Sequence, residues 1–137
     1  MPWLDVSATE PCPCGRLDAR GRPLPYTGCC QPWHAGQPAP DAEALMRSRY
    51  SAFVREDAAY LLSTWHASTR PAAIDFEPGQ RWLGLAVRQH RVVDGTHAEV
   101  EFVARSRLGG RGHRLHERSR FVREDGRWHY VDGDLFP

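Results

Sequence analysis

Three dipeptides in the C-terminal half of the chain constrain the fold more than any other feature of the sequence. Asp94-Gly95, Gly109-Gly110 and Asp125-Gly126 each separate two runs of strand-forming residues. Such pairs are typical of the two-residue turn of a β-hairpin. Three consecutive hairpins make one antiparallel sheet, so the sequence predicts a four-stranded meander.

The strand register can be counted outward from the three turns, and all three hairpins agree. The predicted apolar face consists of Leu83, Leu85, Val87, Ala98, Val100, Phe102, Ala104, Leu115, Phe121, Trp128 and Tyr130. A slip of one residue at the middle turn would put the faces of neighbouring strands out of phase. On the other face, the count places Glu101 opposite Arg88 and Arg118, and Glu99 opposite His90 and Arg120. We interpret these charges as a solvated surface.

The residues before the meander predict two helices. Asp41 is suited to cap the first, and the apolar residues that follow form one stripe at helical spacing from Ala42 to about Arg55. Asp57 is suited to cap a second, shorter helix that ends near Trp65. The apolar stripe is the natural cover for the apolar face of the sheet. We therefore predict an α+β fold in which a small N-terminal knuckle precedes two helices packed on a four-stranded antiparallel meander.

Four polar residues fall on surfaces that the pattern assigns to the core. Glu117, Ser119 and Asp132 share a face with apolar neighbours, with Ser119 opposite Asp132, and Arg49 lies near the middle of the helical stripe. A charge in a core must be paired or hydrogen-bonded. One interpretation is a buried Arg49–Glu117 or Arg49–Asp132 ion pair. The other is a polar-lined pocket, whose candidate residues are Arg49, Trp65, His66, Glu117, Ser119, Tyr130 and Asp132.

All four cysteines lie in two tight pairs near the N-terminus, Cys12 with Cys14 and Cys29 with Cys30. Four thiolates on short, glycine-containing loops suit a tetrahedral metal such as zinc, and they leave no open position for catalysis. The proline-rich segment 12–40 is not expected to form a helix or a central strand, so a metal would hold it together. We therefore predict one structural zinc ion bound by these four cysteines.

Alternatives are open for these thiols and their ligand set. They could form two disulfides or carry out redox chemistry, although pairing within each couple would close small strained rings. His34, four residues after Cys30, could replace one cysteine as a ligand. Residues 1–11 show no periodicity, and we expect them to form an extended lead-in.

Composition limits the classes of function. The 137 residues, 41% of them hydrophobic, suffice for one compact domain and a small appendage. A formal net charge of +1 argues against a nucleic-acid or membrane surface that depends on bulk positive charge. No apolar run approaches the ~20 residues that span a bilayer, and no signal segment begins the chain, so we expect a cytoplasmic protein. No phosphate loop, dinucleotide fingerprint or ordered nucleophile–base set is present. We therefore assign no catalytic residue and favour a non-enzymatic role.

Longer stretches of the chain resemble known families. Cys12-Pro13-Cys14-Gly15 with Tyr26-Thr27-Gly28-Cys29-Cys30 resembles the SEC-C motif, the zinc-binding tail of the translocase ATPase SecA. The stretches 42–53, 62–71 and 126–133 resemble the YchJ-like family of uncharacterised bacterial proteins. That resemblance implies a SEC-C zinc segment, residues 1–40, joined to a nuclear transport factor 2-like (cystatin-like) cone, residues 41–137.

The sequence departs from the SEC-C pattern after the second cysteine. The usual Gly-Ser-Gly reads Gly15-Arg16-Leu17, and residues 18–23 look like an insertion. The ligands survive this change, but a partner surface that uses the ordinary loop is not carried over. In SecA, the motif is a docking surface for a chaperone and for membrane lipid, so the resemblance implies a binding role by analogy.

These features support three functional hypotheses. The first is a protein-interaction module whose zinc knuckle docks a protein partner. The second is a small-molecule binder or an enzyme of isomerase, dehydratase or hydrolase type, with Arg49, His66, Glu117 and Asp132 as candidates and His66 as a possible general base. The third is nucleic-acid binding through the knuckle, helped by Arg16, Arg20 and Arg22 and weakened by the near-neutral net charge.

Overall fold

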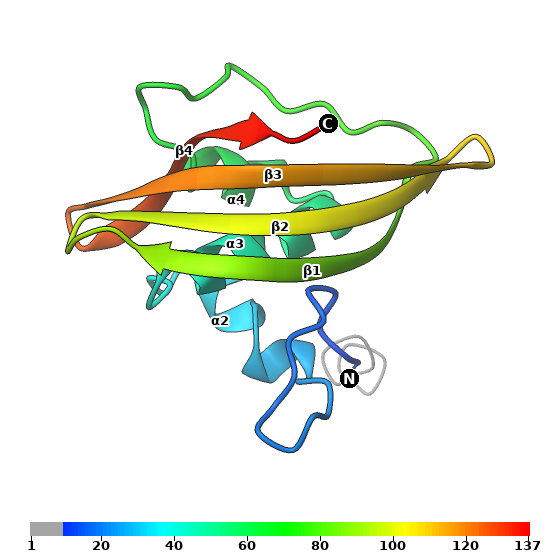
Figure 1. The fold of residues 1–137 in the computed structure, drawn as a ribbon, viewed down its shortest axis with the longest axis horizontal. Coiled ribbons are helices and arrows are strands. Elements are labelled where there is room, and N and C mark those ends of the chain that lie inside the picture. The colour runs from blue at the N-terminus through cyan, green and yellow to red at the C-terminus, as the bar shows by residue number, and fades with distance from the viewer. Residues whose placement is uncertain (1–9) are drawn as a thin grey trace.

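The C-terminal half of the chain is the predicted four-stranded antiparallel meander. A computed structural model describes residues 10–137. It contains one sheet with the strands in sequence order, and Figure 1 shows two of the helices, α3 (Ala42–Val54) and α4 (Ala58–Ser63), behind this sheet. The bounds of the strands are β1 (Arg81–Val92), β2 (His97–Leu108), β3 (Arg111–Glu124) and β4 (Arg127–Leu135).

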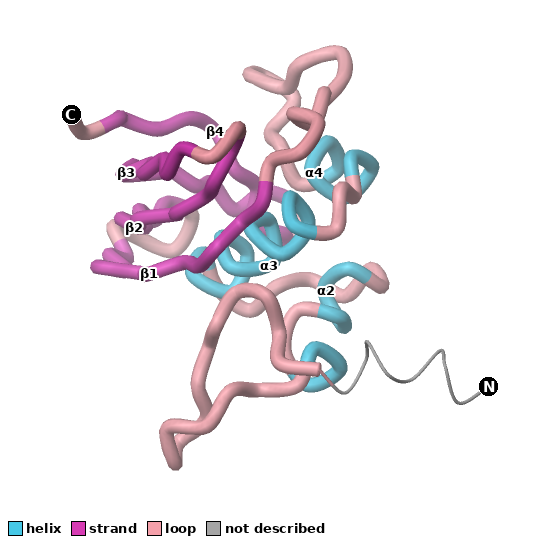
Figure 2. Tube along the Cα trace, turned by 90° about the vertical axis from the view of Figure 1, so that its right-hand side faces the viewer, coloured by secondary structure: helices cyan, strands magenta, loops and turns pink. Residues whose placement is uncertain are grey.

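Both predicted helices are present, and both begin at the predicted caps. Helix α3 (Ala42–Val54) begins after Asp41, whose side chain accepts a hydrogen bond of 2.8 Å from the backbone N–H of Ala44. Helix α4 (Ala58–Ser63) begins after Asp57, whose side chain accepts one of 3.0 Å from the N–H of Tyr60. Figure 2 shows α3 lying against the sheet, so its apolar stripe is the cover that the sequence predicts.

The core of the cone lies between α3 and the concave face of the sheet. Leu45, Met46 and Tyr50 extend from α3, and they are at most 6% exposed. They pack with apolar side chains of the central strands, among which Val100 and Phe121 are at most 2% exposed. Burial of each large apolar side chain contributes about 1.5–3 kcal/mol, so this contact is the main stabilising element of the cone.

The predicted register of the middle hairpin is confirmed over its whole length. Strands β2 and β3 pair without a shift, with Ala98 opposite Phe121 and Ala104 opposite Leu115. The pairs Glu101–Arg118 and Glu99–Arg120 on the other face are also as predicted. The outer hairpins agree near the core, where Leu85 pairs with Ala104, Val87 with Phe102 and Phe121 with Tyr130.

Two β-bulges in β1 account for the residues that counting misplaces on that strand. At the first bulge, Leu83 has no partner on β2 and is 57% exposed, and Trp82 packs against the core instead. The predicted burial of Leu83 is therefore wrong. At the second bulge, Arg88 is skipped, so Glu101 lies opposite Gln89 and not opposite Arg88. From Gln89 to the end of β1, the pairing with β2 is therefore shifted by one residue from the predicted pairing.

One consequence of the second bulge is a changed ion pair on the outer face. Glu99 lies opposite Arg91 rather than His90, and the Arg91 guanidinium lies 3.5 Å from the Glu99 carboxylate. The pair is partly exposed, and such pairs contribute little to stability. His90 lies instead near the N-terminal turn of α3, where its ring is 3.9 Å from Glu43.

A third bulge, in β4, corrects the placement of Asp132. Counting puts Asp132 opposite Ser119 on the core face, but Val131 is an extra residue in the strand. Asp132 therefore lies opposite Arg120, and Arg120 donates a 2.6 Å hydrogen bond to it at the exposed face. Gly133 takes the place opposite Ser119. An extra residue in one strand moves every later side chain to the other face.

The N-terminal segment contains short helices, contrary to the prediction for residues 12–40. A 3₁₀ turn, η1 (Tyr26–Gly28), precedes the helix α2 (Gln31–His34). Pro32 is tolerated because it lies in the first turn of α2, where a backbone N–H has no partner within the helix. Residues 1–9 of the predicted lead-in lie outside the described residues, while Pro11 forms an isolated bridge with Pro25.

The helices of the described chain bear on the membrane prediction. Within residues 10–137, no helix is both long enough and apolar enough to cross a lipid bilayer.

The cap of α3 provides a test of how much one end of this helix contributes to stability. Replacing Asp41 with alanine leaves the N–H of Ala44 without its side-chain acceptor. We expect the free energy of unfolding to fall by about 1 kcal/mol, measured by urea denaturation followed by circular dichroism. Asp41→Asn is the control, because asparagine caps helices as well as aspartate. Equal stability of the alanine and asparagine variants would contradict the role of the cap.

Candidate metal centre and cone cavity

The four cysteines come together in one buried cluster. Their Sγ atoms all lie within 4.8 Å of one another, and all four cysteines are free rather than joined in disulfides. Cys14 is 0% exposed and Cys29, the most exposed of the four, is 9% exposed. The Sγ atoms of Cys14 and Cys29 are 3.5 Å apart, well beyond the ~2.05 Å of a disulfide.

The backbone around each cysteine pair turns tightly enough to aim the sulfurs inward. The N–H of Gly15 donates a 3.1 Å hydrogen bond to the carbonyl of Cys12, and Gly15 has a φ of 73°. That left-handed conformation favours glycine. At the second pair, the N–H of Cys29 donates to the carbonyl of Tyr26, and the N–H of His34 donates to that of Cys30. The Cys12-Pro13-Cys14-Gly15 motif and the Cys29-Cys30 pair are therefore each held by hydrogen-bonded turns.

Without a metal, the four thiols hold their protons unequally. Hydrogen bonds from Cys14, Cys29 and Cys30 lower the pKa of Cys12. The hydrogen bond with Cys12 acts to raise the pKa of Cys14, but those with Cys29 and Cys30 bring it to about 7. The pKa values of Cys29 and Cys30 are raised, foremost by their hydrogen bonds to Cys12. The cluster thus stabilises its first negative charges and opposes further ones.

This arrangement fits a metal ion. A tetrahedral zinc ion with Zn–S bonds of about 2.3 Å has its sulfurs about 3.8 Å apart, and the sulfurs here lie within 4.8 Å of one another. A divalent cation would stabilise the further thiolates that the thiols alone do not, since the thiolate is the form that binds metal. The four cysteines could therefore hold a metal ion, with no water-accessible ligand position for catalysis.

Helix α3 holds the cysteine cluster against the cone. The Ser51 hydroxyl donates to Cys30 Sγ at 3.3 Å and lies 3.5 Å from Cys12 Sγ. Arg47 donates a 3.1 Å hydrogen bond to the carbonyl of Cys14 and another, at 2.8 Å, to Glu43. These contacts involve the face of α3 that points away from the sheet. The sequence pattern did not predict them, because serine and arginine on a helix are ordinarily solvated.

His34, the alternative fourth ligand, is engaged elsewhere. Its Nε2 lies 2.8 Å from the carbonyl oxygen of Ser48, which only accepts, so Nε2 carries the proton and donates. Its Nδ1 then accepts from the hydroxyl of Tyr26 at 2.6 Å. Both ring nitrogens are therefore occupied by contacts that tie the segment after Cys30 to α3. A metal-binding role for His34 does not match this geometry.

A second feature is a cavity of about 250 Å³ between α3 and the sheet. Five of the seven residues proposed for a pocket line it: Arg49, Trp65, Glu117, Ser119 and Tyr130. Its remaining walls are mainly apolar: Met46, Tyr50, Phe53, Trp82, Phe102, Ala104, Leu115 and Phe121. Glu117 and Ser119, the polar residues that the sequence assigns to the apolar face of β3, therefore line a cavity.

The other two proposed pocket residues lie outside the cavity. The bulge in β4 moves Asp132 to the outer face, and His66 lies beyond the end of α4. The ring of His66 contacts Glu124 Oε2 at 2.7 Å and Ser68 Oγ at 2.7 Å. Neither side chain lines the cavity, so the structure does not bring His66 together with the other predicted pocket residues.

Arg49 is 6% exposed, and no carboxylate pairs with it among residues 10–137. Its Nη1 donates to the carbonyl of Leu61 at 2.8 Å and to the Thr64 hydroxyl at 2.6 Å. The guanidinium also lies over the rings of Trp65, at 5.1 Å, and Tyr130, at 4.7 Å. The predicted Arg49–Glu117 and Arg49–Asp132 ion pairs are therefore wrong.

Burial also sets the protonation of Arg49 and Tyr130, which both line the cavity. Desolvation lowers the pKa of Arg49 to about 10, so it is still a cation at neutral pH. Desolvation, followed by the charge of Glu117, raises the pKa of Tyr130 to about 12, so its hydroxyl stays protonated. At neutral pH, the cavity wall therefore presents a guanidinium cation beside a phenol that can donate a hydrogen bond.

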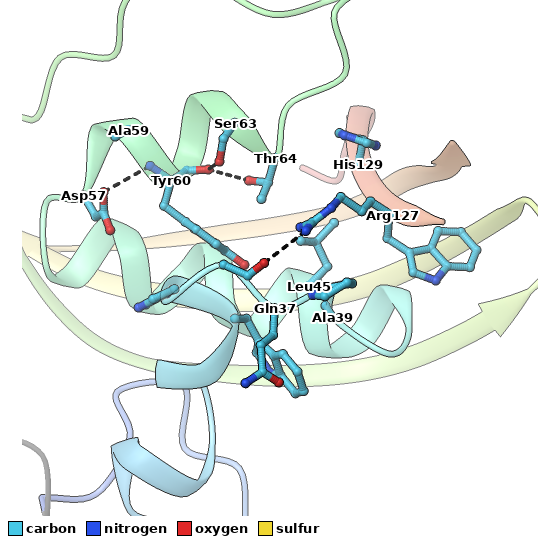
Figure 3. Close-up of a pocket in the computed structure, with 15 residues that line it drawn as sticks. Gln37, Ala39, Leu45, Asp57, Ala59, Tyr60, Ser63, Thr64, Arg127 and His129 are labelled. Carbon is cyan, nitrogen blue, oxygen red and sulfur yellow. Dashed lines mark hydrogen bonds between the residues drawn. The ribbon is translucent and has the colours of Figure 1, made fainter. Parts of the chain in front are cut away.

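A wider crevice of about 500 Å³ separates the segment around Gln37 from α4 and the start of β4. Figure 3 shows Asp57, Tyr60, Ser63 and Thr64 along its helical side. Opposite them, Arg127 donates a 3.1 Å hydrogen bond to the carbonyl of Gly36. On the helical side, Asp57 accepts from the N–H of Tyr60, and the hydroxyls of Ser63 and Thr64 donate to the carbonyl of Tyr60. The crevice therefore lies where the N-terminal segment contacts the cone.

Comparison with known proteins places the chain in a family. The family model described as the YchJ middle NTF2-like domain matches residues 41–133. A UPF0225 protein of Polaromonas naphthalenivorans is 66% identical over 135 residues, which cover 93% of this chain and 99% of that protein. A UPF0225 protein of Methylibium petroleiphilum is 63% identical, with coverage of 95% and 92%.

Solved structures agree with the fold and with the N-terminal motif. A crystal structure of a SEC-C motif containing protein from Psychrobacter arcticus has a TM-score of 0.79 and 31% identity, covering 96% of this chain and 86% of that one. A solution structure of a SEC-C motif containing protein from Rhodopseudomonas palustris has a TM-score of 0.78 and 32% identity, with coverage of 93% and 100%. The chain thus shares the fold of these SEC-C motif containing proteins over nearly its whole length, and it belongs to the YchJ-like UPF0225 family, whose middle domain is NTF2-like.

Proposed function

We propose that the four cysteines bind one structural zinc ion and that the knuckle (residues 12–34) is a protein-docking module. The observation that carries the first part is the closed set of four sulfurs, all at most 9% exposed and within 4.8 Å of one another. Thiolate ligands in a tetrahedral set favour zinc among the common divalent ions. Four protein ligands leave none for a substrate, so the ion would be structural.

A metal has a clear structural task in this part of the chain. The knuckle contains only the three-residue turn η1 and the four-residue helix α2. Its buried side chains are mainly the cysteines themselves and Tyr26. A segment with so small a core needs a disulfide or a metal to be stable. Because the thiols are free, the metal is the fitting solution.

The docking surface we propose is a short hairpin that projects from the knuckle. Leu17 forms a bridge with Pro23, and the N–H of Leu24 donates a 3.0 Å hydrogen bond to the carbonyl of Arg16. Asp18 orders the turn, since its Oδ1 accepts from the N–H groups of Arg20 and Arg22 at 2.8 and 3.0 Å. The insertion is therefore a hairpin closed by backbone hydrogen bonds and ordered at its turn by Asp18.

The side chains on this hairpin suggest the chemistry of a partner. Leu17 is 55% exposed, and the side chains of Arg20 and Arg22 are exposed beside it. Asp18, the acidic residue of the hairpin, uses its carboxylate within the turn. An exposed leucine flanked by arginines is suited to an acidic protein segment that carries an apolar side chain. The docking role of the SEC-C motif in SecA supports this proposal by analogy only.

The zinc proposal predicts the metal content of variants. We expect about one zinc per wild-type chain, measured by elemental analysis of the purified protein, and little in Cys30→Ser. His34→Gln should keep its zinc but lose about 1–2 kcal/mol of stability, because Tyr26 and Ser48 lose their imidazole partner.

The two variants separate the possible ligand sets. If His34→Gln lost its metal while Cys30→Ser kept it, the four-sulfur site would be wrong. If wild-type protein contained another metal in place of zinc, the four-cysteine site would be supported, but the assignment of zinc as its ion would be wrong. Addition of a strong chelator should lower the melting temperature of wild type but not of Cys30→Ser.

The docking proposal predicts a contact at Leu17. A photo-crosslinking amino acid at position 17, introduced in living cells, should capture one specific protein, and Leu17→Asp should abolish copurification of that protein with the chain. Val92→Asp is the matched control, because Val92 is 66% exposed on β1 and outside the knuckle. Binding of the purified partner should weaken as salt increases, since the arginines contribute charge.

The outcomes distinguish docking from its alternatives. Equal loss of the partner in Leu17→Asp and Val92→Asp would reject the hairpin as the docking surface. If nuclease treatment released the captured material, the contact would be with nucleic acid. In that case affinity should fall steeply with salt, and the protein-docking proposal would be rejected.

A further inference from the structure

The cavity of the cone contains a cation whose hydrogen-bonding capacity is only partly used. The guanidinium of Arg49 has five N–H donors, and its contacts with residues 10–137 engage Nη1 alone. The buried and unpartnered side-chain nitrogens of these residues belong to His90 and His129. The Nε and Nη2 groups of Arg49 therefore make no hydrogen bond with residues 10–137, and they are not fully buried. They are donors available in the cavity that Arg49 lines.

A carboxylate lines the same cavity without pairing with that cation. Glu117 accepts a short hydrogen bond from the hydroxyl of Ser119, which fixes its position on β3. Gly133 makes room for it on the neighbouring strand, because a Cβ at position 133 would lie 2.7 Å from Glu117 Oε2. Within the described chain, no ion pair of 4.0 Å or less joins Glu117 to Arg49. The two charges thus face one cavity with a gap between them.

The remaining walls set the shape and polarity of what could fill this gap. They are formed mainly by aromatic rings and aliphatic side chains, among them Phe53, Trp82 and Phe121. The volume of about 250 Å³ is below the ~300–1,000 Å³ of pockets for drug-sized ligands. One or two fused rings fit such a space. Leu115 is a lining residue that is 38% exposed, so part of the cavity wall is in contact with solvent.

We infer that the cone cavity binds a small, uncharged, ring-containing molecule whose polar end bridges Arg49 and Glu117. The polar end must accept a hydrogen bond from the free N–H groups of the guanidinium and donate one to the carboxylate. A primary amide has both functions in one planar group. The apolar body of the ligand lies against the aromatic walls. This site is independent of the metal centre and of the docking hairpin.

Charge balance favours an uncharged ligand over an organic acid. Arg49 and Glu117 contribute one positive and one negative charge to the same apolar space, so the empty cavity is neutral overall. A bound carboxylate would gain Arg49 but would face the like charge of Glu117 in a poorly solvated space, which is strongly unfavourable. A hydrocarbon without polar atoms would leave the free donors of Arg49 unused.

Three probes with one shared ring system test this inference: 2-naphthamide, 2-naphthoate and naphthalene. Binding to the intact, metal-loaded protein is measured by NMR titration of the backbone amides. We expect the amide to bind about tenfold more tightly than either other probe, since a hydrogen bond to a charged group is worth about that factor or more. Naphthoate binding more tightly than naphthamide, or no binding by any probe, would overturn the inference.

Glu117→Gln tests the charge argument within the same cavity. Glutamine keeps an acceptor for the Ser119 hydroxyl and removes the negative charge, so the fold should be preserved. We expect the affinity for naphthoate to rise about tenfold, because Arg49 is then the sole charge in the cavity. An unchanged order of preference among the probes would contradict a ligand that contacts Glu117.

A pair of matched variants tests the location of the ligand. Ala104 lines the cavity, while Ala86 lies on the outer face of the sheet, opposite Val103. Ala104→Leu should fill the cavity and reduce naphthamide affinity at least about tenfold, whereas Ala86→Leu should not change it. Thermal melting checks that both variants are folded. Equal affinity in the two variants would place the probe outside the cavity and reject the site.

Discussion

The two-sided burial of α3 is the contact on which the rest of the structure depends. One face of the helix packs Leu45, Met46 and Tyr50 on the sheet. The other face presents Ser51 to the sulfurs of the knuckle and the carbonyl of Ser48 to His34. A surface helix of this length ordinarily has one apolar stripe and one solvated face. Here the second face is polar because its partner is a set of thiols.

This arrangement explains why the knuckle needs no hydrophobic core of its own. Its turns are closed by backbone hydrogen bonds, and its contacts with α3 are made by hydrogen bonds from Ser51 and Arg47. Arg55 adds a cation–π contact over the ring of Tyr26 at 4.4 Å. Each of these interactions is worth about 1 kcal/mol, so they orient the knuckle but do not suffice to fold it. A metal ion held by the four cysteines would supply the remaining constraint.

The sequence was most informative where periodicity and turn chemistry were regular. The caps Asp41 and Asp57, the meander and the register of the middle hairpin all follow from local rules, and the structure confirms them. The bulges at Arg88 and Val131 break the period of two without an adjacent glycine or proline, whereas the bulge at Leu83 is followed directly by Gly84, a signal that counting from the turns does not take into account. Counting across them therefore assigns later side chains to the wrong face.

The candidate sites show the same division between local and tertiary information. The four cysteines could be grouped from sequence because their spacing carries the chemistry. The contacts of Arg49 with Leu61 and Thr64 could not, because a backbone carbonyl at a helix end has no sequence signature. Gly133 is similar: its importance is the space that it leaves for Glu117, which appears only once β3 and β4 are paired.

The two sites differ in how completely their chemistry is satisfied within the chain. Four sulfurs could complete the coordination of one metal ion, and their burial leaves no approach for a substrate. Arg49 and Glu117 are the opposite case, since each is held by protein contacts on one side and left open to the cavity on the other. Burying opposite charges apart from each other costs free energy, which a folding role alone does not offset. The same helix thus closes one site and leaves the other incomplete, and recognition of a small molecule belongs to the incomplete one.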